Sequence, residues 1–120
     1  MDVKHCDPKP FENRRERLRG LMAERGLQAL LVSFAANRYY LTGFELHDSQ
    51  CNESVGWLVV TAKGPDALFT DPRFTDAALR LWPAEDLCIY GAGKHAAVAE
   101  FLKGRGIATL GFDPKAMSVY

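Results

Sequence analysis

The stretch RLRGLMAERGLQALLVSFAANRYYLTGF, residues 17–44, decides the fold of this chain. It begins inside a helix that starts near residue 11 and ends at Gly26, because glycine suits a left-handed helix end. The run ENRRER is predicted to be the solvated side of this helix. Its buried face is predicted to hold Phe11, Leu18, Leu21 and Met22. ALLVSF, residues 29–34, is continuously apolar, which predicts a central parallel strand covered on both faces.

The rest of the chain alternates strand and helix patterns. VGWLVVTA, residues 55–62, and DALFTD, residues 66–71, flank the turn signal KGP and predict a hairpin. Asp71-Pro72 is a favoured helix start, and Pro83 ends that helix. The buried residues of this helix are predicted to be Phe74, Ala77, Ala78 and Leu81. A strand is then predicted at DLCIYG, and the last strand at ATLGFD. Between them, HAAVAEFLKGRG predicts a helix with Val98, Phe101 and Leu102 inward.

This order predicts the fold class α/β, as a three-layer α/β/α domain with a mixed, mostly parallel sheet of about five strands. Trp57 and Trp82 are expected in its core. A length of 120 residues with 48% hydrophobic residues fits one domain. Residues 1–10, with two prolines and no periodic pattern, are predicted to be a flexible arm, and residues 11–120 to be the domain.

Charge and cysteine usage exclude several function classes. Fifteen basic and fifteen acidic side chains cancel, so no positive field favours nucleic acid or a membrane surface as a partner. The apolar runs are too short to span a bilayer, and the first ten residues lack the apolar stretch of a signal peptide. Three cysteines without a CxxC pair argue against a disulfide framework, and Cys88 is expected to be a small buried hydrophobe. We expect a cytoplasmic protein.

A dinucleotide-binding fingerprint is one functional hypothesis. After the strand ending at Tyr90 come Gly91-Ala-Gly93-Lys-His-Ala96 and a helix, and Asp113 lies 20 residues after Gly93. That fingerprint normally follows the first strand of its fold, whereas only one more strand follows here. The two glycines have a simpler explanation in the tight turn that any strand-to-helix connection needs. A small nucleotide- or dinucleotide-binding module therefore stays an alternative.

The polar segment ELHDSQCNE is the other candidate from residue chemistry. It offers five potential metal ligands: Glu45, His47, Asp48, Cys51 and Glu53. Such a segment between elements is more often a solvated loop than a metal site, so we predict no metal there. No GxSxG, HExxH or P-loop pattern occurs in the chain. We therefore predict no catalytic residue and no bound cofactor within the chain.

Two sequence signatures resemble one known family. The first is NRYYLTGF, residues 37–44, placed after an Arg-Gly helix end and a Leu-rich strand; the second is LFTDPRFTDAA, residues 68–78. Together they resemble the N-terminal domain of the creatinase, prolidase and Xaa-Pro aminopeptidase family, the pita-bread metallopeptidases. The resemblance covers about residue 14 to the end and implies a creatinase N-terminal domain-like fold with a ribonuclease H-like motif.

The resemblance implies a non-catalytic role. In the family, two divalent metal ions (Mn, Co or Zn) are bound by Asp, Asp, His, Glu and Glu of a C-terminal catalytic domain, which this sequence does not include. The chain alone should then not hydrolyse peptides, and its partners would be its own catalytic domain and a second copy in a homodimer. It would contribute dimer contacts and shape substrate access for proline-containing peptides. Which substrate is used is left open, and an exposed apolar face is expected where the catalytic domain docks.

The resemblance also selects four residues as substrate-pocket or partner-subunit contacts: His47, Asp48, Arg73 and Tyr40. For His47 and Asp48, an exposed loop without contacts is an equally good interpretation. Tyr39 and Tyr40 are predicted to pack against the sheet, since large aromatic residues are mostly buried scaffold. Arg73 has a local alternative as well, an exposed ion pair with Asp71 or Asp76.

Overall fold

The computed structural model describes residues 9–33, 35–43, 56–90 and 93–112. In chain order its elements are α1 (Lys9–Glu24), β1 (Ala29–Val32), α2 (Ala35–Thr42), β2 (Gly56–Thr61), β3 (Ala67–Thr70), η1 (Pro72–Phe74), α3 (Thr75–Leu79), η2 (Ala84–Asp86), β4 (Leu87–Ile89), α4 (Lys94–Gly104) and β5 (Leu110–Phe112). The helix α1 thus begins two residues before the predicted domain boundary. Within these residues no helix combines the length and the hydropathy needed to cross a lipid bilayer.

The strands form one mixed sheet in the order β4-β3-β2-β1-β5. β2 runs antiparallel to both of its neighbours, β1 and β3. β2 and β3 form the predicted hairpin. β5 is parallel to β1, and β4 is parallel to β3. Four strands therefore share one direction, which confirms a mixed and mostly parallel sheet. The carboxyl ends of these four strands lie at the same edge of the sheet as the start of β2.

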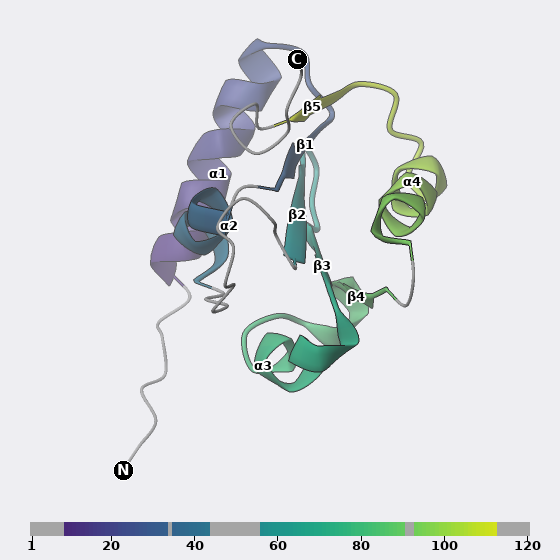
Figure 1. The fold of residues 1–120 in the computed structure, drawn as a ribbon. Coiled ribbons are helices and arrows are strands. Elements are labelled where there is room, and N and C mark those ends of the chain that lie inside the picture. Colours follow the sequence, from purple (N-terminus) through teal and green to yellow (C-terminus); the bar gives the residue numbers. More distant parts are fainter. Residues whose placement is uncertain (1–8, 34, 44–55, 91–92, 113–120) are drawn as a thin grey trace.

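Two apolar clusters lie on opposite faces of the sheet, so the predicted three layers are present (Figure 1). One cluster joins α1, α2 and the α3 region to the sheet and contains Met22, Leu41, Leu58, Leu68, Ala78 and Trp82. The other lies under α4 and contains Leu31, Trp57, Val59, Phe69 and Val98, with Phe101 and Leu102 packed against it. Burial of Trp57 and Trp82, each 7% exposed, is confirmed. Cys88 is half-buried beside the second cluster, and burial raises the pKa of its thiol.

Gly26 and the side chain of Gln28 fix the connection between α1 and β1 and its position beside β5. Gly26 has a φ of 69°, which confirms its predicted place after the end of α1. Gln28 Oε1 accepts hydrogen bonds from the backbone N–H of Ala108 at 2.6 Å and of Thr109 at 2.9 Å. These bonds tie the start of β1 to the segment before β5, so they set the parallel register of the two strands.

The prediction of the buried face of α1 was wrong for Leu21. This side chain is 53% exposed, whereas Met22 is 2% exposed. The inward stripe of the helix also includes two arginines, Arg15 and Arg19, of which Arg15 belongs to the run ENRRER that was predicted to be solvated. The stripe is therefore rotated relative to the one expected from apolar residues alone.

Candidate functional site

Two of the four predicted contact residues, His47 and Asp48, lie outside the described residues. In the sequence they stand between Gly43, which follows α2, and Gly56, which begins β2. Gly56 lies at the carboxyl edge of the other four strands, because β2 alone runs in the opposite direction. In open α/β sheets ligands bind at the carboxyl ends of the strands, so this edge is where a site is expected.

The signature NRYYLTGF places a buried arginine at this edge. Arg38 on α2 is only 1% exposed, and its Nη1 donates a hydrogen bond of 2.9 Å to the carbonyl oxygen of Gly56. It also makes further interactions. Thr42 Oγ1 donates to the carbonyl oxygen of Arg38 at 2.7 Å, one helical turn back. Since a buried charged donor stabilises strongly only when it is paired, Arg38 fixes the start of β2 against α2.

Gly43 of the same signature ends α2 for two physical reasons. Its φ is 76°, a conformation that favours glycine, and its N–H donates to the carbonyl oxygen of Tyr39 at 2.7 Å. The ring of Phe11 also lies against it, so that a Cβ at Gly43 would come within 2.8 Å of Phe11 Cε2. The first turn of α1 is thereby packed onto the end of α2.

The packing predicted for Tyr39 and Tyr40 was wrong. Their side chains are 46% and 50% exposed, because the buried positions of α2 are taken by Arg38, Leu41 and Thr42. These three residues follow the i, i+3, i+4 spacing of one helical face, which leaves the tyrosines on the other side. The guanidinium of Arg14 lies 4.3 Å from the ring centroid of Tyr40. Tyr40 is thus accessible for contact, as its proposed role requires.

Arg73 forms the local ion pair with Asp71 that the sequence left as an alternative. Its Nε lies 3.0 Å from Asp71 Oδ1, and its side chain is 69% exposed. Asp71 caps η1 by accepting a hydrogen bond of 2.9 Å from the backbone N–H of Arg73. Hydrogen bonds from the Arg73 side chain, then from its backbone, lower the pKa of Asp71. Arg73 is therefore held in one orientation while remaining exposed.

Tyr40 and Arg73 do not lie in one shared pocket. Tyr40 lines a groove between α1 and α2, and Arg73 is not among the residues of that groove. Arg73 instead lies just after β3, and β2 separates β3 from β1, a strand that contributes to the groove. The structure thus supports two separate exposed positions at this end of the sheet, rather than one assembled site.

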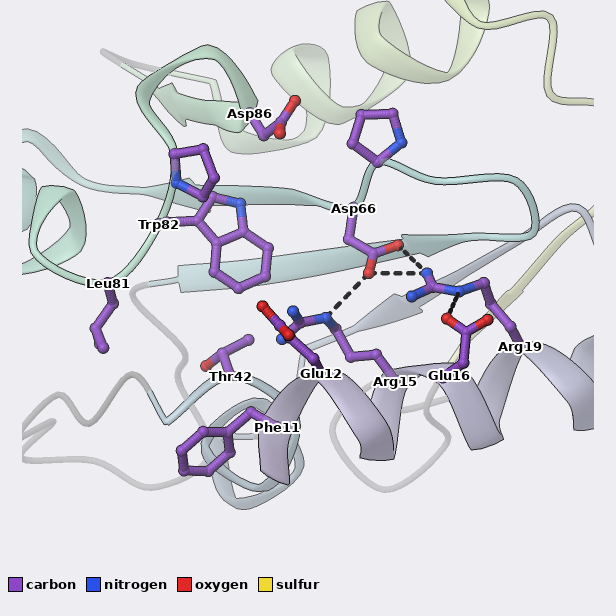
Figure 2. A pocket seen from close by; sticks show the side chains of 12 residues that line it. Phe11, Glu12, Arg15, Glu16, Arg19, Thr42, Asp66, Leu81, Trp82 and Asp86 are labelled. Carbon is purple, nitrogen blue, oxygen red and sulfur yellow. Dashed lines mark hydrogen bonds and ion pairs between the residues drawn. The ribbon is translucent and has the colours of Figure 1, made fainter. Parts of the chain in front are cut away.

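A cavity with a buried charge cluster lies elsewhere, between α1, the β2–β3 hairpin and the segment after α3 (Figure 2). Its volume is about 390 Å³. Arg19 Nη1 donates to both carboxylate oxygens of Asp66, at 2.7 and 2.9 Å. Arg15 Nε lies 3.1 Å from Asp66 Oδ2, at ion-pair distance but without the alignment of a hydrogen bond. Asp66 Oδ1 also accepts a bond of 2.9 Å from the backbone N–H of Thr61.

The buried position of the cluster affects the pKa of both arginines. Burial lowers the pKa of Arg15, and the opposite charge of Asp66 only partly offsets it. For Arg19 burial acts in the same direction, but the hydrogen bond and charge of Asp66 outweigh it, so that the pKa of Arg19 is raised. The guanidinium of Arg15 also lies 4.7 Å from the ring centroid of Trp82. The cluster therefore holds α1 onto the hairpin.

Sequence reasoning missed this cluster. The signal was the i, i+4 spacing of Arg15 and Arg19, which puts both side chains on the helix face that also holds Leu18 and Met22. The described residues contain no group of three or more His, Cys, Asp or Glu side chains that could hold a metal ion. The five potential ligands of residues 45–53 lie outside the described residues. Among the residues that line the cavity, none is arranged as a nucleophile with a base.

The dinucleotide alternative receives no support from the GAGKHA segment. Gly91, Ala92 and Asp113 lie outside the described residues, but Gly93 and the helix α4 can be judged. The third position of the fingerprint must be small so that helix and strand approach closely, yet Ala96 is exposed. A Cβ at Gly93 would meet only Ala96 Cβ, at an ordinary 3.5 Å. β4 is moreover an edge strand, not the centre of a switch point.

Comparison with known proteins identifies the family. The model of the Creatinase/Prolidase N-terminal domain matches residues 14–120. The chain belongs to this family. An Xaa-Pro aminopeptidase from Streptococcus pyogenes is 34% identical, with a TM-score of 0.70 over 87% of this chain and 74% of that one. The N-terminal domain of cytoplasmic peptidase PepQ from Mycobacterium tuberculosis H37Rv is 30% identical, with a TM-score of 0.72 over 89% and 77% of the two chains.

This creatinase/prolidase N-terminal domain also matches part of longer chains. The Xaa-Pro dipeptidase from Bacillus anthracis has the same fold, with a TM-score of 0.75 and 24% identity, and the match covers 91% of this chain but 28% of that one. Among curated proteins, none is similar enough to match. The fold and family predicted from the two signatures are confirmed.

Proposed function

We propose that this chain is the non-catalytic N-terminal domain of a Xaa-Pro aminopeptidase- or prolidase-like metallopeptidase. The observation that carries this proposal is the family match over residues 14–120, together with 34% identity to an Xaa-Pro aminopeptidase. Since a fold alone does not define a function, the identity of 30% or more in two solved relatives is what favours the peptidase role.

Catalysis would take place in another domain. The dipeptidase from Pyrococcus horikoshii OT3 is 29% identical, and the match covers 25% of its chain. In that protein and in the longer relative from Bacillus anthracis, most of the chain therefore lies outside the similarity. The described residues offer no ligand cluster for a pair of divalent ions. Two ions (Mn, Co or Zn) are accordingly proposed for a C-terminal catalytic domain, and no reaction step is assigned to this chain.

The proposed contribution of this domain is substrate access and dimer contact. Arg73 and Tyr40 present exposed side chains, and both are positioned by neighbours, Asp71 and Arg14 respectively. A positioned guanidinium or phenol contributes more to binding than a mobile one, because less side-chain entropy is lost. These two residues, with His47 and Asp48, would contact a proline-containing peptide or the partner subunit. We place the full protein in the cytoplasm, as a homodimer.

The test begins with the reading frame beyond the codon of Tyr120 in the source genome. We expect it to continue for roughly 200 residues or more, enough for a further domain. The product of the whole frame, supplied with Mn²⁺, should hydrolyse a Xaa-Pro dipeptide or a Xaa-Pro-Xaa tripeptide. A frame without spaced Asp, Asp, His, Glu and Glu, or a folded product without such hydrolysis, would contradict the proposal.

Variants then test the role of this domain. Arg73→Ala should raise KM while kcat is unchanged, since a rim contact binds substrate and transition state equally. Arg80→Ala is the matched control, because Arg80 is an exposed arginine at the end of α3. Equal effects of the two substitutions on KM would remove Arg73 from the substrate-access role. Sedimentation of the full protein measures the proposed dimer separately.

A further inference from the structure

One side of α1 has a stripe of side chains that extends from Leu18, at the border of the first apolar cluster, to the solvent-exposed Arg17 and Leu21. Arg14, Arg17, Leu18 and Leu21 recur at i, i+3, i+4 and i+7, which is the spacing of one helical face. Leu21 is 53% exposed and Arg17 is exposed. A second stripe of the same helix, with Arg15, Arg19 and Met22, already faces the domain. The described residues therefore cover the inner stripe and Leu18, but they leave Arg17 and Leu21 of the outer stripe exposed.

The outer stripe forms one wall of an apolar groove. The groove has a volume of about 520 Å³ and lies between α1, α2 and the β1–β5 end of the sheet. Its apolar lining comprises Leu18, Leu21, Leu30, Val32, Leu41 and Phe112, with Tyr40 from α2. Leu21, Tyr40 and Phe112 are 53%, 50% and 45% exposed. Such a concentration of exposed large apolar side chains in one place is typical of an interaction surface.

Gly111 is the reason that the sheet is hollowed here. In the register of β1 and β5, Gly111 pairs with Leu30 and so occupies the face of β5 that looks toward α1. A Cβ at Gly111 would come within 3.0 Å of the Cδ1 atoms of Leu27 and Leu30. The absent side chain at Gly111 lets the Leu27 and Leu30 side chains lie close to the edge strand β5, which leaves space above them for side chains of another element.

The charged residues that line the groove have one sign in the part of the chain that the structure describes. They are Arg14 and Arg17, and none of the described lining residues is an Asp or a Glu. Arg14 is held in place because its Nη1 donates a hydrogen bond of 2.9 Å to the carbonyl oxygen of Tyr40 and its guanidinium lies over the Tyr40 ring. The groove thus offers an apolar floor beside positioned positive charge. Its complement is a segment that carries apolar side chains together with carboxylates.

We propose that this groove binds an acidic amphipathic helix of a partner protein. Two or three apolar side chains of that helix would fill the space above Leu30 and beside Leu21, and its flanking Glu or Asp side chains would pair with Arg14 and Arg17. A helix fits because ridges at i, i+3 and i+4 pack into the grooves of another helix such as α1. This docking requires no peptidase activity, so its failure is distinguishable from failure of the proposed function.

A second copy of the chain is a poorer occupant. In a two-fold symmetric contact the same patch meets itself, so that two hollows would face each other and neither would be filled. The same symmetry would bring the arginines of both copies together, and the described residues of the groove include no carboxylate to neutralise them. Both effects oppose a homodimer through this face, while leaving other faces available for one.

The probe is a synthetic helical peptide of about four turns, with Leu at i, i+3, i+4 and i+7 and Glu and Ala elsewhere. A matched peptide has Lys in place of every Glu. Fluorescence anisotropy with the 120-residue chain should show binding of the acidic peptide and about tenfold weaker binding of the basic one. Leu21→Glu should weaken binding of the acidic peptide by about tenfold, as expected for a central apolar contact. Arg17→Glu should shift the preference toward the basic peptide.

Leu79→Glu and Arg80→Glu are the matched controls. Leu79 is 48% exposed on α3, and Arg80 is exposed beside it, so that each control has the same chemistry away from the groove. Both should leave peptide binding unchanged. Arg17→Glu, at the exposed rim, keeps the test decisive if Leu21→Glu disturbs the helix.

Four results would overturn the proposal. They are equal binding of the two peptides, equal loss in the Leu79 and Leu21 variants, a wild-type dimer that dissociates in Leu21→Glu, and loss of hydrogen-exchange protection in residues 113–120 of that variant. The dimer result would assign the groove to a second copy. The hydrogen-exchange result would assign it to the chain's own end.

Discussion

The four arginines of α1 meet two opposite environments. Arg15 and Arg19 lie on the inner side and share the carboxylate of Asp66, whereas Arg14 and Arg17 border the apolar groove on the outer side. The helix and the residue type are the same, so position on the helical wheel decides the role. The inner charges stabilise the domain, and the outer charges remain accessible to a partner.

The two sides differ in energetic terms as well. An exposed ion pair contributes little, because water screens it and both side chains lose freedom. A buried pair is costly to form but also costly to break, since the remaining charge is left without its partner in a poorly hydrated place. The side chain of Asp66 is 5% exposed, and those of Arg15 and Arg19 are 13% and 19% exposed. The inner cluster is therefore where a single substitution should matter most.

Asp66→Ala is the substitution with the largest expected effect. It removes the acceptor of Arg19, the counter-charge of Arg15 and the acceptor of the Thr61 N–H at once. We expect the free energy of unfolding to fall by about 3 kcal/mol, as for other broken buried pairs. Urea denaturation followed by Trp fluorescence measures this change.

Glu16→Ala is the control for Asp66→Ala. Glu16 pairs with the same Arg19 at 3.1 Å, but its side chain is 73% exposed. Its removal should change stability by less than about 0.5 kcal/mol. If both substitutions cost the same, the distinction between buried and exposed carboxylates at this helix is lost.

Gly43→Ala tests how firmly the inner side of α1 is seated on α2. Alanine there must adopt a φ of 76°, and its Cβ would meet the ring of Phe11. We expect a loss of about 1–3 kcal/mol from the strained backbone conformation. Gly20→Ala should do the opposite and stabilise by about 0.5–1 kcal/mol, because Gly20 lies inside α1 with nothing near its missing Cβ. Thermal denaturation of the two variants side by side should show a lower melting temperature for Gly43→Ala and a higher one for Gly20→Ala.

Arg15→Leu and Arg17→Leu compare the two sides of α1 directly. Arg15→Leu leaves Asp66 with Arg19 and the Thr61 N–H, so we expect a moderate loss of about 1–2 kcal/mol. Arg17→Leu should change stability by less than about 0.5 kcal/mol, as is usual for surface positions. Equal urea midpoints for the two variants would show that the inner and outer arginines do not differ in stabilising the fold.

The family and the layer order could be predicted from the sequence because they depend on local patterns. The run ALLVSF, the KGP turn and the Asp-Pro helix start each act within a few residues. The roles of the arginines could not be predicted, because they depend on a contact between residues 47 positions apart, Arg19 and Asp66. A charge run on a helix is solvated on average, and only the tertiary partner shows which members are not.

The burial predicted for the two tyrosines was wrong for a related reason. An average preference of aromatic residues for burial was applied to Tyr39 and Tyr40, although the i, i+3, i+4 spacing of Arg38, Leu41 and Thr42 defines the buried face of α2. A polar residue on that face hid the periodicity. The groove could not be predicted from local patterns, since its shape depends on the pairing of Gly111 with Leu30 in the neighbouring strand.

The pair of Asp71 and Arg73 gives the smallest expected effect and the sharpest contrast with Asp66. The same two residue types meet here in solvent, where the Arg73 hydrogen bonds lower the pKa of Asp71 in the folded state. A lowered pKa means that the ionised carboxylate contributes to stability above its ordinary pKa, and that this contribution is lost as pH falls through the lowered value. Asp71→Asn keeps a capping oxygen but removes the charge, so the variant and the wild-type protein should differ in melting temperature at neutral pH and converge as the pH falls through the lowered pKa of Asp71. Arg73→Ala should abolish most of this pH dependence, because the Arg73 side chain is its first cause. A difference between the wild-type protein and the Asp71→Asn variant that stays constant with pH would show that the cap acts through its geometry alone, and that in this fold an arginine–carboxylate pair affects stability only where it is buried.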